Sequence, residues 1–349
     1  MDKIPVAVLG ATGMVGQRFV QLLADHPWFE IRALTGSERT AGGIYQEVCR
    51  WVLDEDIPAG IGEMAVSATN ASLPARILFS ALPSRAARQV EPVLAEAGYI
   101  VCSNASAFRQ EADVPLIIPE VNGDHLALLE YQRQNRGWPG LLVTSPNCTA
   151  TGLVMPLKPL HDDFGVAQVF VTTLQAVSGA GHPGVPYLDI IDNVIPNIAG
   201  EAEKIQDETR LLLGRMDAGR RLPGGMELSV QTNRVPVIDG HTVNMTIKFE
   251  RPPSPEEAAE VLSAFRGPDP VPGLPSAPAE PILVRNEPDR PQPRRDRDAS
   301  AGMSVTVGSI QPCPILDMRL ISVVHNTLRG AASGSILNAE LLVAQGYTG

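Results

Sequence analysis

Short apolar runs alternate with amphipathic stretches over the first 146 residues of the chain. Strands buried on both faces of a parallel sheet are nearly continuous apolar runs, whereas covering helices repeat apolar residues three and four positions apart. The expected strands are Ile4–Leu9, Phe29–Leu34, Ile77–Ala81, Tyr99–Cys102 and Leu141–Thr144, and the expected helices between them include Val15–Ala24 and Ala86–Ala97. This alternation predicts an α/β fold with a Rossmann-like, doubly wound parallel sheet.

The pattern changes after residue 146 into longer runs rich in Val, Thr and Ile. Runs of this kind are typical of a mostly antiparallel sheet, and helical patterns lie between them. The expected strands are Gln168–Val177, Glu227–Pro236, Thr242–Glu250, Ser304–Gln311 and Arg319–Val324, with helices over Tyr187–Asn193, Gly200–Leu213 and Glu256–Phe265. We therefore expect a second, α+β domain over residues 147–326.

The end of the chain and a proline-rich stretch complicate this division. Gly330–Gly346 has a helical apolar pattern, and we expect it to return to the first domain, which then comprises residues 1–146 plus 327–349. Gly267–Pro293 holds nine prolines, a composition typical of a flexible linker. Strand signals resume directly afterwards, however, so an ordered excursion within the second domain fits equally well.

Composition narrows the classes of function. The net charge of −11 argues against a nucleic-acid partner, and four cysteines without paired spacing argue against a disulfide framework or a structural metal. The N-terminus lacks the features of a signal peptide, and no run reaches the roughly 18 apolar residues of a membrane helix. We expect a cytoplasmic protein with no bound metal and no membrane partner.

A glycine-rich turn follows the first expected strand. Its residues are Gly10, Ala11, Thr12, Gly13, Met14, Val15 and Gly16, and an apolar helix comes next. Glycines at such a junction let the backbone approach a pyrophosphate, and the free N–H groups of the helix bind it. The spacing GxxGxxG is a variant of the usual fingerprint, so its position between strand and helix carries the prediction of a dinucleotide site.

The end of the second expected strand distinguishes NAD from NADP. An NAD site usually places an acid there, whereas Ser37, Arg39 and Thr40 can donate hydrogen bonds to a 2′-phosphate. Glu38 is the exception in this stretch, and we expect it to face solvent. We therefore predict NADP as the cofactor, with a solvated loop arginine as the alternative reading of Arg39.

Candidate chemistry begins at Cys148. The expected strand Leu141–Thr144 leads through Asn147 and Cys148 into a helical pattern, which places the thiol near a helix N-terminus. A thiol in that position has a lowered pKa and is accessible as a thiolate, and Asn147 with the first helical N–H groups can hold an oxyanion. His241 and Arg234 flank a hairpin turn and offer a base and a bidentate carboxylate ligand.

The motifs, in their order along the chain, resemble those of the aspartate-semialdehyde dehydrogenase family. They are Gly10–Gly16, Ser80-Ala-Leu82, Pro119-Glu-Val-Asn122, Ser145-Pro-Asn-Cys148-Thr149, Gln175-Ala-Val-Ser-Gly-Ala-Gly181, Glu201-Ala-Glu-Lys204 and Arg234-x6-His241. The run Arg290-Pro-Gln-Pro-Arg294 resembles the archaeal and fungal branch of that family. The resemblance covers nearly the whole chain, from residue 4 to the C-terminal helix.

The resemblance implies a role for each matching position. Cys148 is the nucleophile, His241 the general acid/base and Gln175 the residue that positions the substrate. The remaining implied ligands are Arg234 for the substrate carboxylate, Glu201 for its amino group, Lys204 and Arg109 for phosphate, and Ser80, Ala81, Leu82, Ser178, Gly179 and Asn326 for the cofactor. Without the resemblance, Glu201 and Lys204 read as an exposed pair on a helix surface.

The implied activity is the reversible, NADPH-dependent reductive dephosphorylation of L-aspartyl-4-phosphate to L-aspartate-4-semialdehyde through a cysteine thioester. It belongs to the biosynthesis of lysine, threonine and methionine, and the second domain is then the catalytic and dimerisation domain of a homodimer or homotetramer. One alternative is an acyl-CoA reductase on the same scaffold, acting on a substrate such as malonyl-CoA. Another is a non-catalytic NADP-sensing protein, which has no use for Cys148, His241 and Arg234 together.

Overall fold

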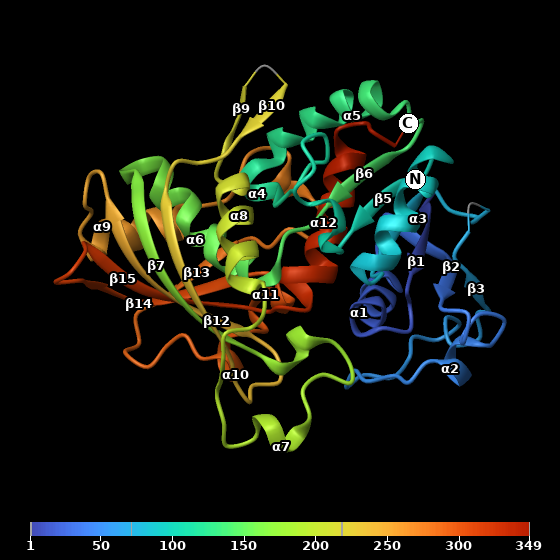
Figure 1. The fold of residues 1–349 in the computed structure, drawn as a ribbon, viewed down its shortest axis with the longest axis horizontal. Coiled ribbons are helices and arrows are strands. Elements are labelled where there is room, and N and C mark those ends of the chain that lie inside the picture. Colours follow the sequence, from blue (N-terminus) through green and yellow to red (C-terminus); the bar gives the residue numbers. More distant parts are fainter. Residues whose placement is uncertain (1, 71, 218, 349) are drawn as a thin grey trace.

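Two large sheets, each with its own helices, and a short two-stranded sheet are found in the structure (Figure 1). It is a computed structural model that describes residues 2–70, 72–217 and 219–348. Residues 1 and 349, the two ends of the expected first domain, lie outside this description. The division of the chain at residues 147 and 327 stays a prediction.

The first sheet is parallel throughout and follows the apolar runs of the first 146 residues. Its strand order is β3-β2-β1-β4-β5-β6, and each neighbouring pair is parallel. The strands are β1 (Ile4–Leu9), β2 (Phe29–Gly36), β3 (Val66–Ala68), β4 (Ile77–Ser80), β5 (Ile100–Ser103) and β6 (Leu141–Thr144), and the helices of this part are α1 (Met14–Leu23), α2 (Tyr45–Val48), α3 (Ser84–Glu96), α4 (Pro119–Asn122) and α5 (Leu128–Arg136). The predicted Rossmann-like sheet is confirmed, while β3 and α5 lay outside the expected elements.

The second sheet has seven strands in the order β13-β14-β15-β12-β7-β11-β8. They are β7 (Val166–Gln175), β8 (Ile195–Pro196), β11 (Glu227–Arg234), β12 (His241–Phe249), β13 (Ile282–Arg285), β14 (Val305–Pro312) and β15 (Met318–Val324). Its pairs are antiparallel except for β7 with β11 and β13 with β14. The mostly antiparallel sheet is therefore confirmed.

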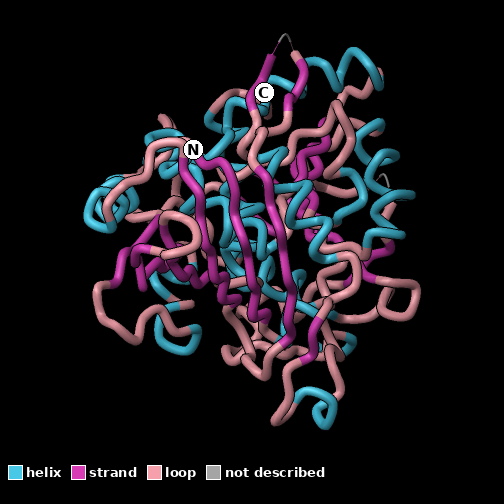
Figure 2. The backbone as a smooth tube through the Cα atoms, turned by 60° about the vertical axis from the view of Figure 1, so that its left-hand side comes forward, coloured by secondary structure: helices cyan, strands magenta, loops and turns pink. Residues whose placement is uncertain are grey.

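Helices cover one face of this sheet. They are α6 (Cys148–Phe164), α8 (Glu201–Leu212) and α9 (Pro255–Ala264). Figure 2 looks onto the opposite face, where the long strands lie in front of the helices. Phe170 of β7 is 54% exposed on the sheet. The short elements α7 (Tyr187–Ile190), β9 (Arg215–Asp217), β10 (Arg220–Leu222), α10 (Pro293–Asp296) and α11 (Ala299–Gly302) lie in the connections.

The C-terminal helix α12 (Ser333–Ala344) packs into the core of the first sheet, as the sequence predicted. Ile336 and Leu337 of α12 belong to the same apolar cluster as Phe19 of α1. The proline-rich stretch is ordered: Leu274 joins that cluster, and Ser276 donates its hydroxyl to the buried carboxylate of Glu340 at 2.6 Å. The ordered excursion is therefore confirmed, although its partners lie in the first core.

Candidate active site

Helix α6 begins at Cys148, the expected nucleophile, directly after β6 and a three-residue turn. The side-chain oxygen of Asn147 caps α6 by accepting hydrogen bonds from the main-chain N–H groups of Thr149 (2.8 Å) and Ala150 (3.1 Å). The Sγ atom of Cys148 lies 3.2 Å from Nε2 of His241. These two residues are 93 positions apart in the chain. The sequence predicted a cysteine and a histidine for the site, and the structure brings the two side chains into contact.

His241 is fully buried at the first position of β12. Its Nδ1 atom accepts a hydrogen bond from the main-chain N–H of Ala176 at 3.0 Å, just beyond the end of β7. Gly179 packs against the other side of the ring, where a Cβ atom would lie 3.0 Å from Cε1 of the imidazole. Both ring nitrogens therefore have a partner, and a side chain at residue 179 would crowd the ring.

The protonation states of the pair differ from the expectation. Burial, followed by the nearby Glu201 carboxylate, raises the pKa of the Cys148 thiol to about 12, against the opposing effect of Arg109, the Thr149 N–H and Arg234. The lowered thiol pKa expected at the start of a helix is therefore wrong for the ligand-free site, because desolvation outweighs the helix N-terminus. Burial, together with Arg234 and His325, lowers the pKa of His241 to about 3.

Arg234 and Gln175 end the neighbouring parallel strands β11 and β7, where they are direct partners in the register. Nη1 of Arg234 donates to the main-chain oxygen of Ala176 at 2.8 Å, and burial lowers the pKa of Arg234. Both side chains are buried beside the catalytic pair. A guanidinium anchored by one nitrogen keeps donors for a carboxylate, the role that the resemblance implies for Arg234.

Glu201 and Lys204 lie on the first turn of α8, which packs against α6. The Glu201 carboxylate accepts a hydrogen bond from Nδ2 of Asn147 at 2.8 Å, so this residue reaches the cysteine loop. Lys204 is exposed, and none of the hydrogen bonds and ion pairs found within residues 2–70, 72–217 and 219–348 involves it. The structure brings Glu201 to the site and leaves Lys204 in solvent, one helical turn further along.

Arg109 is buried near Cys148, where its guanidinium is oriented by a residue that the sequence did not single out. The carboxylate of Glu208 on α8 accepts two hydrogen bonds, one from Nη1 of Arg109 at 2.9 Å and one from the main-chain N–H of Asn147 at 2.5 Å. Nη2 of Arg109 donates to the main-chain oxygen of Asn104, whereas its buried Nε has no hydrogen-bond partner. Glu208 follows Glu201 by seven residues and so lies on the same face of α8. This spacing was the feature of the sequence from which a role for Glu208 at the site could have been predicted.

A pocket of about 260 Å³ joins the cysteine to the glycine-rich turn. Its lining includes Cys148 and Arg109 together with Met14, Val15, Gly179 and Asn326. Asn326 connects two of these walls, since its side chain accepts from Gly240 N–H and donates to Ser178 Oγ, both at 2.8 Å. Residues expected at the cofactor and at the nucleophile therefore share one cavity.

The glycine-rich turn itself has the shape that a dinucleotide needs. Gly10 has a left-handed φ of +72°, and a Cβ atom at Gly16 would overlap the carbonyl oxygen of Gly10. Gly10 also packs against the main-chain oxygen of Ala81 and the side chain of Leu82, beyond the buried Ser80. The glycines therefore keep the main chain of the turn in a conformation without side chains of its own at Gly10 and Gly16, as close approach of a pyrophosphate requires.

The other expected cofactor residues lie on the surface beside this turn. Gly13 precedes α1 and is exposed, while Thr12 is half-buried. Ser37 and Arg39 are exposed after β2, and Thr40 folds back so that its hydroxyl donates to the Ser37 carbonyl at 3.1 Å. Glu38 is also exposed, as expected.

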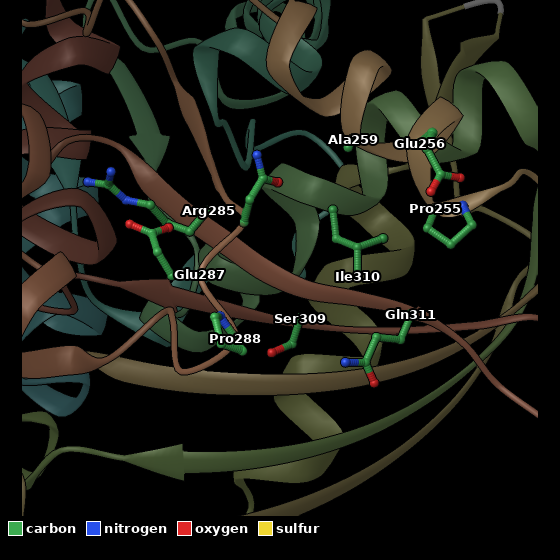
Figure 3. A pocket seen from close by; sticks show the side chains of 10 residues that line it. Pro255, Glu256, Ala259, Arg285, Glu287, Pro288, Ser309, Ile310 and Gln311 are labelled. Atoms are coloured by element: carbon green, nitrogen blue, oxygen red, sulfur yellow. The ribbon is translucent and has the colours of Figure 1, made fainter.

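A second hollow, of about 290 Å³, lies on α9 and the ends of β13 and β14, away from the catalytic pair (Figure 3). Arg285, Glu256 and Glu287 line it, and its lining contains neither a cysteine nor a histidine. Within the part of the chain that the structure describes, there is no group of three His, Cys, Asp or Glu side chains suited to a metal ion. No helix in the same part is long and apolar enough to cross a membrane.

A Rossmann-like parallel sheet, a glycine-rich turn and a cysteine–histidine pair beside the same pocket are the features expected of a dehydrogenase that uses a cysteine. Comparison with known families agrees, since residues 5–129 match the NAD-binding domain of semialdehyde dehydrogenases and residues 157–329 their dimerisation domain. The chain belongs to the aspartate-semialdehyde dehydrogenase family, and is therefore an oxidoreductase that forms an oligomer.

Individual relatives support this membership over the whole chain. The aspartate-semialdehyde dehydrogenase of Archaeoglobus fulgidus is 51% identical over 98% of this chain and 99% of its own, and that of Schizosaccharomyces pombe is 44% identical over 98% of both. The structure of the Candida albicans enzyme with NADP has a TM-score of 0.91 at 41% identity and covers 99% of each chain. The resemblance to archaeal and fungal members is confirmed.

Proposed function

We propose that the chain catalyses the reversible, NADPH-dependent conversion of L-aspartyl-4-phosphate to L-aspartate-4-semialdehyde, with Cys148 as the nucleophile. This is the reductive dephosphorylation expected from the sequence, in the biosynthesis of lysine, threonine and methionine. The observation that carries the proposal is the 3.2 Å approach of Cys148 Sγ to His241 Nε2, at a pocket that Cys148 lines together with Arg109 and the glycine-rich turn. A protein that only senses NADP has no need of this pair.

The cofactor site fits NADP. Glycines at the turn let a pyrophosphate approach the main chain, and Ser37, Arg39 and Thr40 offer donors to a 2′-phosphate at the end of β2. The related Candida albicans enzyme was solved with NADP. When bound, NADPH supplies the hydride that reduces the thioester.

Different side chains bind the different chemical groups of the substrate. Arg234 binds the carboxylate, and Glu201 faces the amino group from the start of α8. Arg109, which lines the pocket with Cys148, binds the leaving phosphate, and the solvated Lys204 approaches the same phosphate when substrate is present. Gln175 and Asn147 position the acyl carbon at the sulfur, and His241, whose Nε2 lies 3.2 Å from the sulfur, acts as the general acid/base.

The decisive experiment is a turnover assay of the purified chain with aspartyl phosphate and with malonyl-CoA, each with NADPH and with NADH. We expect turnover of aspartyl phosphate with NADPH, phosphate as the product and no use of malonyl-CoA. Turnover of malonyl-CoA alone would replace the acyl-phosphate reading by the acyl-CoA reductase reading.

For the assembly, we propose a homodimer or homotetramer joined through the uncovered face of the second sheet, which bears the exposed Phe170. Light scattering of the purified chain distinguishes these two states from a monomer. A cytoplasmic location remains the expectation from the sequence.

A further inference from the structure

The glycine-rich turn has main-chain donors that the described residues leave unsatisfied. Gly13 precedes α1 and offers no side chain, so the first N–H groups of this ten-residue helix have no side-chain cap. Within the part of the chain that the structure describes, the Thr12 N–H also has no hydrogen-bond acceptor. Free donors of this kind suit an anion such as a pyrophosphate, provided that the main chain of the turn holds them in one orientation.

The carbonyl side of the same turn is occupied by two buried side chains. The Tyr45 hydroxyl, on α2, donates to the main-chain oxygen of Ala11 at 2.9 Å. Nε2 of Gln17, on α1, donates to the main-chain oxygen of Thr12 at 3.0 Å. Tyr45 is completely buried and Gln17 is 1% exposed, so neither side chain reaches water. Tyr45 and Gln17 together form a carbonyl clamp behind the turn.

Holding a carbonyl group also orients a donor, because a trans peptide group carries its C=O and the following N–H on opposite sides. The Ala11 carbonyl points to the buried Tyr45, so the Thr12 N–H of the same peptide group points away from the interior. The Thr12 carbonyl shares its peptide group with the Gly13 N–H, which closes the turn by donating to the Gly10 oxygen at 3.1 Å. The carbonyl clamp therefore determines where the N–H groups of the turn lie.

The carbonyl clamp is itself held by the segment that contains and follows α2. Nε2 of Gln17 also donates to the Arg50 oxygen at 2.9 Å, and its Oε1 accepts the Val52 N–H at 2.8 Å. The ring of Tyr45 packs edge-on against Trp51, with 6.4 Å between the ring centroids. Burial raises the pKa of Tyr45 well above its usual range, so the hydroxyl keeps its proton and remains a donor. Both members of the clamp thus have fixed positions in the ligand-free protein.

We propose that Tyr45 and Gln17 are positioning residues for the cofactor: by holding two carbonyl groups of the turn against the interior, they keep its N–H groups available to the pyrophosphate of NADP. This inference rests on the proposed function and adds two residues to its cofactor site. Both side chains are buried behind the turn, so each acts through the main chain. A turn that is ordered before binding loses less conformational entropy when the cofactor binds, and this increases affinity.

The test compares two tyrosine hydroxyls of the first 146 residues. Tyr45→Phe removes the donor to Ala11 and keeps the ring. The matched control is Tyr99→Phe, which removes a hydroxyl that donates to the Leu73 oxygen at 3.1 Å, before the start of β5 rather than after the end of β1. Loss of the first hydroxyl should raise the Kd values for NADPH and NADH by the same factor, roughly three- to tenfold. Loss of the second should leave both Kd values unchanged.

Two further measurements separate a positioning role from a general loss of stability. At saturating cofactor, kcat and the KM for the aldehyde should be the same in Tyr45→Phe as in the wild type. Adenosine 2′-monophosphate carries the 2′-phosphate but no pyrophosphate, so its Kd, obtained by competition with NADPH, should also be unchanged. An unchanged Kd for NADPH in Tyr45→Phe, a loss restricted to NADPH, or an equal loss in Tyr99→Phe overturns the proposal.

Gln17→Met tests the second member of the clamp. Methionine has a similar length but no N–H donor, so the Thr12 and Arg50 carbonyls lose their partner. We expect a larger rise in Kd than in Tyr45→Phe, again equal for NADPH and NADH, together with a lower Tm. A folded Gln17→Met variant with the wild-type Kd values overturns the role of Gln17. If this variant does not fold, the comparison of the two tyrosine variants decides the question.

The outcomes separate this inference from the proposed function, because cofactor binding is measured without substrate. A chain that shows the expected effect of Tyr45→Phe on both Kd values but does not turn over aspartyl phosphate would keep the carbonyl clamp and overturn the function. Turnover of aspartyl phosphate with no effect of Tyr45→Phe on cofactor binding would do the reverse.

Discussion

Two strand-to-helix junctions at the same edge of the parallel sheet carry the function, and they are built in opposite ways. At the first, β1 leads into α1 through glycines, and the site is formed by main chain packed too closely at Gly16 to admit a Cβ atom. At the second, β6 leads into α6 at Cys148, and side chains from α8, β11 and β12 converge on it. The comparison shows that the cofactor turn is formed by residues close together in the sequence. The site around Cys148, in contrast, needs side chains from residues far away in the sequence.

The largest expected effect is at the second junction. Cys148→Ala should abolish turnover, and Cys148→Ser should lower kcat by roughly 10³-fold or more, because a hydroxyl lacks thiolate character near neutral pH. NADPH binding, measured by fluorescence titration, should stay nearly unchanged, since the glycine turn is a separate structure. Near-normal turnover in either variant would contradict the nucleophile assignment.

The ionisation of Cys148 provides the next test. Burial raises the pKa of this thiol to about 12, so the thiolate is a small fraction at pH 7 in the ligand-free enzyme. The thiolate fraction, and with it the rate of alkylation by iodoacetamide, should rise about tenfold per pH unit between pH 7 and 9. The Cys148→Ala variant gives the background from the other cysteines. A rate that reaches a plateau below pH 8 would show that the helix N-terminus outweighs burial after all.

At the first junction we expect Gly16→Ala to act through the backbone. The added methyl group would overlap the carbonyl oxygen of Gly10, and crowding of this kind typically costs about 1–3 kcal/mol. NADPH affinity should fall roughly tenfold or more, with a lower Tm. Gly225→Ala is the matched control, because no atom lies within 4 Å of the added Cβ there. Equal effects of the two substitutions would remove the special role of the turn.

Arg39→Ala tests the choice of cofactor at the same junction. A hydrogen bond to a charged group contributes about 1.5–3 kcal/mol, and the exposure of Arg39 favours the lower end. NADPH should therefore weaken about tenfold and NADH hardly at all, as measured by the Kd values for the two cofactors. Arg32→Ala, on β2, is the control. Equal losses for NADPH and NADH would show that Arg39 does not bind the 2′-phosphate.

The smallest effect is expected from Lys204→Ala. Because Lys204 is exposed, its contact with phosphate is worth about 1 kcal/mol or less. In the oxidative direction the KM for phosphate should rise a few-fold, with a smaller change in the KM for the aldehyde. The neighbouring Glu203→Gln is the control on α8. An unchanged phosphate KM would leave Arg109 as the phosphate ligand and return Lys204 to the helix surface.

Much of the fold could be predicted because the strands and helices follow patterns of apolar and polar residues over short stretches of the chain. β1 and β6 occupy the expected residues, and the boundaries of α1 and α8 differ from expectation by one residue at each end. The elements that were missed are short or have mixed patterns, such as β13 within the proline-rich stretch and the polar helix α5. Their formation depends on the pairing of β13 with β14 and on the packing of α5 beside β6, which no local window contains.

The sequence by itself determined the glycine turn, the cysteine at a strand-to-helix junction and the family to which both belong. These depend on neighbours along the chain, where sterics and hydrogen-bond geometry act over a few residues. Only the tertiary structure decided that Glu208 joins Arg109 to the cysteine loop, that the Cys148 thiol pKa is raised, and that Ala176 occupies Nδ1 of His241. The physical reason is that burial and orientation are properties of packed surroundings, and residues far apart in sequence supply them.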